Sequence, residues 1–248
     1  MTGTMTISHH ISRWISLPAL ALGIAAFSPA FASKQSDAAL MEQIKAAYSA
    51  GSYDKFNRLV SELPQKSVFR PYADIWQFRF FQKGIEKQFP NQELVWNKTD
   101  IVPLLNKHEN SWPAETLRRD WLEQLARTAQ WDEFAEQRKQ LRYRPDQGVE
   151  CADLMHAAEQ GQLVRYKLNA VISFDKRLPK TCRVMLKNMY KVGGITAQDL
   201  DRHVLQMVAD NQLTNAVKFV EEFQDTAWGK AIDGNTLREA TSSPEKYL

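Results

Sequence analysis

The chain has 248 residues, of which 44% are hydrophobic and 25% are charged, and its formal net charge is +3. This is the composition of a globular protein, and it excludes an intrinsically disordered chain. Basic and acidic residues are interspersed, so no basic stripe predicts a nucleic-acid-binding protein.

The first 32 residues predict a secretory signal peptide. Arg13 supplies a basic start, residues 15–27 form an apolar run, and Ala30 and Ala32 form a small-x-small cleavage signal. The run is shorter than the about 20 apolar residues that a membrane-spanning helix needs. No later stretch is apolar enough to span a membrane. We therefore expect cleavage after Ala32 and an exported chain without an integral membrane segment.

Four stretches of the chain share one turn pattern. A small or turn-tolerant residue is followed by Ser or Gln, then by a large apolar residue, with an apolar or small residue three positions further on. The copies are Gly51–Phe56, Ala129–Phe134, Gly161–Tyr166 and Asn211–Ala216. Amphipathic runs precede and follow each copy, as at a tight helix–turn–helix corner. Repeated but unevenly spaced corners predict an all-α fold, an irregular α-superhelix or solenoid of helix–turn–helix pairs.

Capping and breaking residues predict where the helices of the first half begin and end. Ser36 is an expected N-cap, and the first helix ends at Gly51. The second helix ends at Pro64. Thr99 or Asp100 is an expected cap for a short helix through residue 105, and a stronger helix begins at residues 112–113.

Residues 69–84 predict a helix that is unusually rich in aromatic residues. Tyr72, Trp76 and Phe80 fall on one face at helical spacing. One interpretation is a platform on which sugar rings stack. The other, which the pattern favours, is core filling between helices, because aromatic stripes most often bury apolar area.

Further helices are expected in the second half. One covers residues 150–159, and Thr181 is an expected cap for another that ends at Gly193-Gly194. Thr196 with Asp199 resembles a capping box. The helical signal fades from Asp225. We expect one α-superhelical domain over residues 33–240 and a flexible tail over residues 241–248.

The two cysteines, Cys151 and Cys182, predict a disulfide. An even pair of cysteines in an exported chain favours a bridge over the alternative, two unpaired buried thiols. The chain-entropy model gives such a bridge, which closes a loop of about 30 residues, a stabilisation of about 3.5 to 4 kcal/mol.

The sequence contains no Gly-x-Gly-x-x-Gly motif, no phosphate-binding loop, no Gly-x-Ser-x-Gly nucleophile elbow, no Cys-x-x-Cys and no His-Glu-x-x-His. The close pairs His108–Glu109 and Cys151–His156 lack further ligands at a suitable spacing for a metal. We interpret these histidines as surface residues. No catalytic, cofactor-binding or metal-binding residue is predicted.

Several segments, mainly between residues 117 and 220, form one further pattern. They are residues 121–131, Cys151, residues 157–161, residues 178–182 with Cys182, Gly193-Gly194 and residues 209–213. In these segments the chain resembles the N-terminal superhelical domain of the soluble lytic transglycosylases. The resemblance implies a periplasmic protein of Gram-negative bacteria whose partner is peptidoglycan or a cell-wall enzyme. The family's catalytic Glu-Ser dipeptide and its Gly-Leu-Met-Gln stretch do not occur in this chain.

Three functions follow as alternatives. The first is a non-catalytic periplasmic scaffold associated with peptidoglycan. The second is the N-terminal part of a truncated or split lytic transglycosylase, and the third is a helical-repeat adaptor that binds proteins. We expect no glycan cleavage by the isolated chain, because no carboxylic acid lies in a recognisable catalytic motif.

Overall fold

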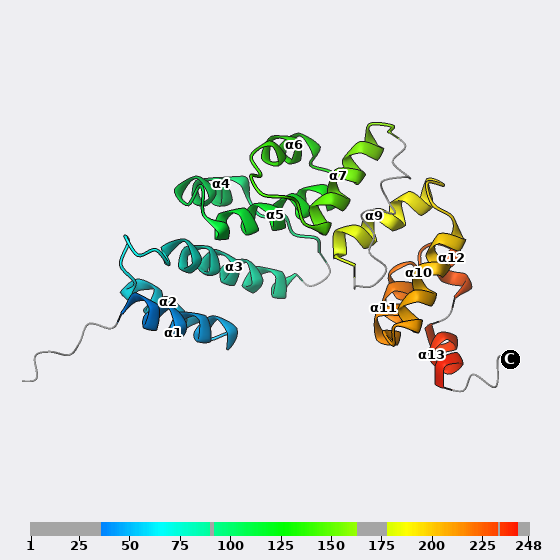
Figure 1. Cartoon of the computed structure of the whole chain (residues 1–248), viewed down its shortest axis with the longest axis horizontal. Coiled ribbons are helices and arrows are strands. Elements are labelled where there is room, and N and C mark those ends of the chain that lie inside the picture. The colour runs from blue at the N-terminus through cyan, green and yellow to red at the C-terminus, as the bar shows by residue number, and fades with distance from the viewer. Residues whose placement is uncertain (1–35, 90–91, 163–177, 233, 243–248) are drawn as a thin grey trace, which may run out of the picture.

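A computed structural model describes residues 36–89, 92–162, 178–232 and 234–242 of the chain. Within these ranges there are twelve α-helices and no β-strand, so the predicted all-α class is confirmed. Figure 1 shows α1 and α2 towards one end of the long axis and α10 to α13 towards the other. The helices are α1 (Asp37–Ser49), α2 (Tyr53–Glu62), α3 (Arg70–Gln88), α4 (Lys98–Lys107), α5 (Trp112–Arg127), α6 (Trp131–Lys139), α7 (Gln147–Glu159), α9 (Lys180–Lys191), α10 (Ala197–Ala209), α11 (Leu213–Glu222), α12 (Ala227–Ala231) and α13 (Gly234–Ser242).

The expected cleavage residues Ala30 and Ala32 lie outside the described residues, as do the last four residues of the third corner. Beyond Asp225, where the helical signal fades, the described residues include α12 and α13, and α13 ends at Ser242. None of the described helices combines the length and the hydropathy needed to cross a membrane.

The four corners share one backbone geometry. Their first residues have left-handed φ angles of +68° at Gly51, +55° at Ala129, +76° at Gly161 and +58° at Asn211. In each corner the next N–H donates to the carbonyl five residues earlier at 2.8 to 3.0 Å, and the corner residue's own N–H donates to the carbonyl three residues earlier. This pair of hydrogen bonds is the Schellman motif, which satisfies the last carbonyls of a helix.

Three of these corners join two described helices that pack against each other. They connect α1 with α2, α5 with α6, and α10 with α11. The apolar or small residue five positions after each left-handed residue is buried: Phe56, Phe134 and Ala216. The corner pattern therefore sets both the chain reversal and the first core contact of the next helix.

Helix starts agree with the sequence at some caps and differ at others. The side chains of Ser36 and Thr196 accept hydrogen bonds from the first turns of α1 and α10, and Thr196 forms the predicted capping box with Asp199. The predicted cap of α4 is wrong, because Asn97 takes that role. The predicted cap at Thr181 is also wrong: α9 begins at Lys180 after Pro179, and Thr181 is fully buried.

The buried apolar residues form three clusters along the chain. One lies among α1, α2 and the start of α3, and a second lies around α5 with parts of α3, α4, α6 and α7. The third includes residues of α7, α9, α10, α11 and α12. Helix α5 packs against α3, α4, α6, α7 and α9, which places it at the centre of the structure (Figure 1).

Cys151 and Cys182 form the predicted disulfide, which joins α7 to α9. Both cysteines are fully buried in the third apolar cluster, and α7 and α9 pack against each other around the bridge. The covalent link thus lies where these two helices already share apolar contacts.

Candidate functional site

The three aromatic residues predicted on one face of α3 have different surroundings. All three are half-buried and pack against the first apolar cluster, which lies among α1, α2 and the start of α3. Trp76 stacks on Tyr48 of α1, with ring centroids 5.2 Å apart, and Tyr72 meets Trp76 edge-on at 6.1 Å. Phe80 also lines an open groove, whereas Tyr72 and Trp76 do not.

The groove lies between the α1–α2 corner and the C-terminal half of α3, which runs alongside that helix pair (Figure 1). Its volume is about 680 Å³, a size typical of sites for small ligands. It is lined by aromatic, glycine, lysine and small polar residues: Tyr48, Ser49, Gly51, Tyr53, Phe80, Phe81, Lys83, Gly84, Ile85, Lys87 and Gln88. We call this site the aromatic groove.

Phe80 is the ring at which the walls of the aromatic groove meet. Its centroid lies 5.5 Å from that of Tyr48 and 5.3 Å from that of Tyr53, both in edge-on geometry. On its other side it contacts the buried Phe56. Tyr53 and Phe81, which both line the groove, are 43% and 56% exposed, so a ligand can reach both rings.

The sequence opens this groove by placing glycine on both sides. Gly51 takes the left-handed conformation of the corner, and Gly84 lies on α3. A Cβ atom at either position would meet no heavy atom within 4 Å. The helical spacing of α3 brings Phe80, Gly84 and Lys87 to one side of the helix, so the rings stand beside an open strip of backbone.

The charge of the aromatic groove comes from two lysines on α3. Lys83 Nζ lies 5.2 Å from the centroid of Tyr48, within the range of a cation–π contact. Lys87 follows one turn later, and the lining contains no acidic residue from the described ranges of the chain. The groove therefore combines aromatic rings with positive charge.

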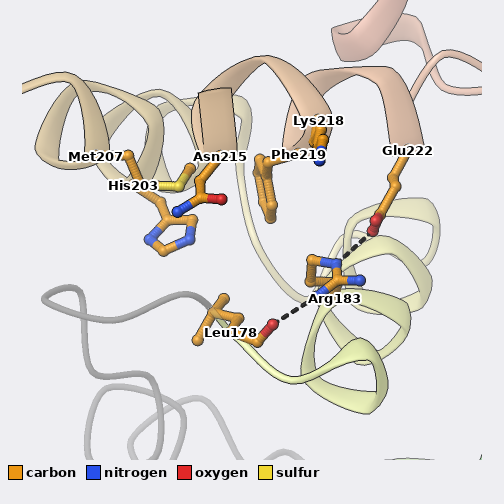
Figure 2. Close-up of a pocket in the computed structure, with 8 residues that line it drawn as sticks. All are labelled: Leu178, Arg183, His203, Met207, Asn215, Lys218, Phe219 and Glu222. Carbon is orange, nitrogen blue, oxygen red and sulfur yellow. Dashed lines mark hydrogen bonds and ion pairs between the residues drawn. The ribbon is translucent and has the colours of Figure 1, made fainter. Parts of the chain in front are cut away.

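A second, much smaller cavity lies between α9, α10 and α11 (Figure 2). Its volume is about 10 Å³, which is room for about one water molecule. Figure 2 shows Arg183 beside it, where Arg183 donates to Glu222 at 2.6 Å and to the carbonyl of Leu178 at 2.5 Å. Burial lowers the pKa of His203 to about 4, so its imidazole is neutral at neutral pH.

The interpretation of His108 as a surface residue is wrong. It is buried against α3, where its Nε2 atom lies 2.9 Å from Asp74 Oδ2. Lys107 and Arg70 also contact the Asp74 carboxylate at 2.7 Å. Burial opposes ionisation of Asp74, but the hydrogen bonds from Lys107 and His108 and the charge of Arg70 hold its pKa below the usual value. The group joins α3 to α4.

No set of three or more His, Cys, Asp or Glu in the described part of the chain is arranged to hold a metal ion. His156, which is close to Cys151 in the sequence, stacks on Trp131 with centroids 5.3 Å apart. His108 and His156 thus both have packing partners in the structure.

A further exposed aromatic pair lies away from the groove. Trp112, at the start of α5, meets Tyr143 edge-on at 5.5 Å, and the Arg119 guanidinium lies 5.1 Å from the Trp112 ring. Each of the two aromatic residues is 49% exposed. No local sequence pattern relates these two residues, because Trp112 lies on α5 and Tyr143 lies between α6 and α7.

Sequence reasoning identified Phe80 but missed most of the aromatic groove. Tyr48 and Tyr53 flank the first corner, Phe81 and Lys83 lie on other faces of α3, and Lys87 lies beyond the predicted helix of residues 69–84. The sequence signal that could have indicated the groove is the corner glycine Gly51 before the aromatic-rich helix α3.

Comparisons of the chain with protein-family models, with curated proteins and with solved structures found no match.

Proposed function

We propose that this chain is a non-catalytic periplasmic scaffold, an irregular α-superhelix related to that of the soluble lytic transglycosylases, and that it binds the glycan of peptidoglycan. The observation that carries the binding function is the aromatic groove. The four repeated Schellman corners support the superhelical arrangement, and the buried disulfide supports an exported protein.

The chemistry of the groove favours a sugar. The C–H face of a pyranose ring carries partial positive charge and packs on the negative face of an aromatic ring. Tyr53 and Phe81 offer exposed rings for this contact, and Ser49, Gln88 and the tyrosine hydroxyls supply polar groups at the edge.

The same lining is less suited to a partner helix. Grooves that bind amphipathic helices present a series of apolar pockets for residues one turn apart. Among the described residues of the lining, Ile85 is the one aliphatic side chain, and the other apolar side chains are aromatic. A short stretch of oligosaccharide fits the volume of about 680 Å³ better.

The proposal is tested by co-sedimentation of residues 33–248 with purified sacculi. We expect binding that is lost in the double variant Tyr53→Ala/Phe81→Ala. The matched control is Trp112→Ala/Tyr143→Ala, which removes two comparably exposed aromatic rings outside the groove and should bind like the unmodified chain. Equal binding by all three proteins, or no binding by the unmodified chain, would exclude the groove as a glycan site.

A further inference from the structure

The aromatic groove contains a feature that a site for a neutral sugar does not need. Lys83 and Lys87 lie one turn apart on α3 and both line the groove. In the described part of the chain, neither has an ion pair with a carboxylate, although five other lysines do: Lys98, Lys107, Lys180, Lys187 and Lys191. The two ammonium groups are therefore available to a ligand.

The surroundings of these lysines make the positive charge effective. Among the residues that the structure describes, no Asp or Glu lines the groove, and Glu86, which is exposed on the same helix, lies outside the lining. One ring face of Tyr48 is stacked on Trp76 at 5.2 Å, while Lys83 Nζ lies 5.2 Å from the same ring centroid. Tyr48 thus holds the Lys83 ammonium close to the aromatic wall.

On the basis of the proposed function, we propose that the aromatic groove selects an acidic oligosaccharide, in which a carboxylate attached to the sugar itself binds Lys83 and Lys87 while a ring of the same ligand packs on Tyr53 or Phe81. A sugar that carries its own carboxylate can contact both the aromatic rings and the two lysines of the lining at the same time. The rings take the apolar face, and the ammonium groups pair with the acid within the same 680 Å³ site.

The carboxylate of a stem peptide is the other source of negative charge in peptidoglycan. We assign the groove to the sugar acid because the lysines lie among the rings of the same lining. A peptide carboxylate would engage the lysines without occupying the aromatic wall.

The test uses isothermal titration of residues 33–248 with three probes. These are peptide-free glycan strands with free lactyl carboxylates, chitooligosaccharides of similar length, which lack a carboxylate, and the free stem peptide. We expect the acidic strands to bind about tenfold more tightly than chitooligosaccharides, since a charge-assisted hydrogen bond contributes at least this factor. The free peptide should not bind.

The double variant Lys83→Gln/Lys87→Gln should lose about tenfold in affinity for the acidic strands and retain its affinity for chitooligosaccharides. The control Lys45→Gln/Lys66→Gln removes the same charge from exposed positions outside the groove and should leave both affinities unchanged. Circular dichroism of each variant before titration establishes that it is folded.

The outcomes separate the two proposals. Equal affinity for acidic and neutral strands, or equal losses in the groove and control variants, would overturn the acid selectivity and leave glycan binding intact. Binding of the free stem peptide would overturn the assignment to the sugar carboxylate. Absence of binding to either glycan would overturn the proposed function together with this inference.

Discussion

The hydroxyl of Thr181, on α9, donates a 2.5 Å hydrogen bond to Oε2 of Glu123, on α5. Arg127 extends the contact, because its Nη1 atom donates to Thr181 Oγ1 at 2.7 Å while its Nε atom donates to Glu93 at 2.8 Å. Thr181 directly precedes Cys182, so this polar network lies beside the disulfide. It ties the central helix α5 to the α7–α9 pair.

The Glu123 carboxyl predicts a pH-dependent contribution to stability. Burial raises its pKa above the ordinary value, assisted by the negative charges of Asp146 and Asp120 and opposed by the bond from Thr181 and the charge of Arg127. The folded state therefore holds the proton more tightly than the unfolded chain does. Between the two pKa values the folded state binds more protons, so this group's contribution falls as the pH rises.

Glu123→Gln should remove that dependence. Its amide oxygen can still accept from Thr181, but it does not ionise. We expect the variant to gain free energy of unfolding relative to the unmodified chain as the pH rises from about 4 to about 8. Urea unfolding of both proteins across this range measures the difference, and a difference that is constant with pH would contradict the prediction.

Gly148, in the first turn of α7, leaves the space that the Glu123 carboxyl occupies. A Cβ at this position would lie 2.2 Å from Glu123 Oε1 and 2.3 Å from Cδ. Since the carboxyl ends a flexible side chain, Gly148→Ala should displace it from Thr181 without distorting α7. Loss of this charged hydrogen bond, about 1.5 to 3 kcal/mol, should exceed the gain of about 0.5 to 1 kcal/mol from replacing a helical glycine, so the free energy of unfolding should fall. In a Glu123→Ala background the loss should disappear, since the clashing atoms are absent.

A double-mutant cycle measures this coupling by denaturant unfolding. Gly84→Ala on α3 is the matched control, because its Cβ would meet nothing within 4 Å. It should instead stabilise the helix by about 0.5 to 1 kcal/mol. Equal effects of Gly148→Ala in both backgrounds would show that the clash is relieved elsewhere.

The four corners predict opposite effects for exchanges between alanine and glycine. Ala129 and Gly51 are both exposed and left-handed, a conformation that an L-residue with a Cβ adopts only at a cost. Ala129→Gly should raise the free energy of unfolding by about 0.5 to 1 kcal/mol, and Gly51→Ala should lower it by about 1 kcal/mol. Thermal unfolding gives both values, and effects of the same sign would contradict the shared Schellman geometry.

The disulfide predicts a large loss of stability on its removal. Cys151 and Cys182 are separated by 31 residues, for which the chain-entropy model gives about 3.5 to 4 kcal/mol. Cys151→Ala/Cys182→Ala should lose roughly this amount in denaturant unfolding. Reduced unmodified chain serves as the comparison, and equal stability of the oxidised and variant proteins would show that the bridge does not constrain the unfolded chain.

Local signals in the sequence determined the helices and several of their ends. The corner pattern at Gly51, Ala129 and Asn211 specified both the left-handed residue and the next buried side chain, because the Schellman motif depends on residues within one turn of each other. The Thr196 capping box is equally local. The cysteine pair was identified from its number and the expected compartment.

Tertiary structure decided which residues of different helices meet. The sequence predicts Thr181 as a cap, yet it is fully buried against Glu123, 58 positions earlier in the chain. The sequence predicts His108 at the surface, yet it contacts Asp74 across a helix pair. Helical periodicity shows that a residue lies on a face, but it does not say which helix covers that face.

In the aromatic groove, too, the sequence predicts the helix but not the contacts between helices. The sequence placed Phe80 on a helix face, and helical spacing alone relates it to Lys87. Only the packing of α3 against the first corner brings Tyr48 and Tyr53 to the same ring. Local hydrogen bonding and periodicity therefore determined the elements of this protein. The site depended on contacts between elements, because those contacts arise from side-chain shapes that meet only after the helices pack.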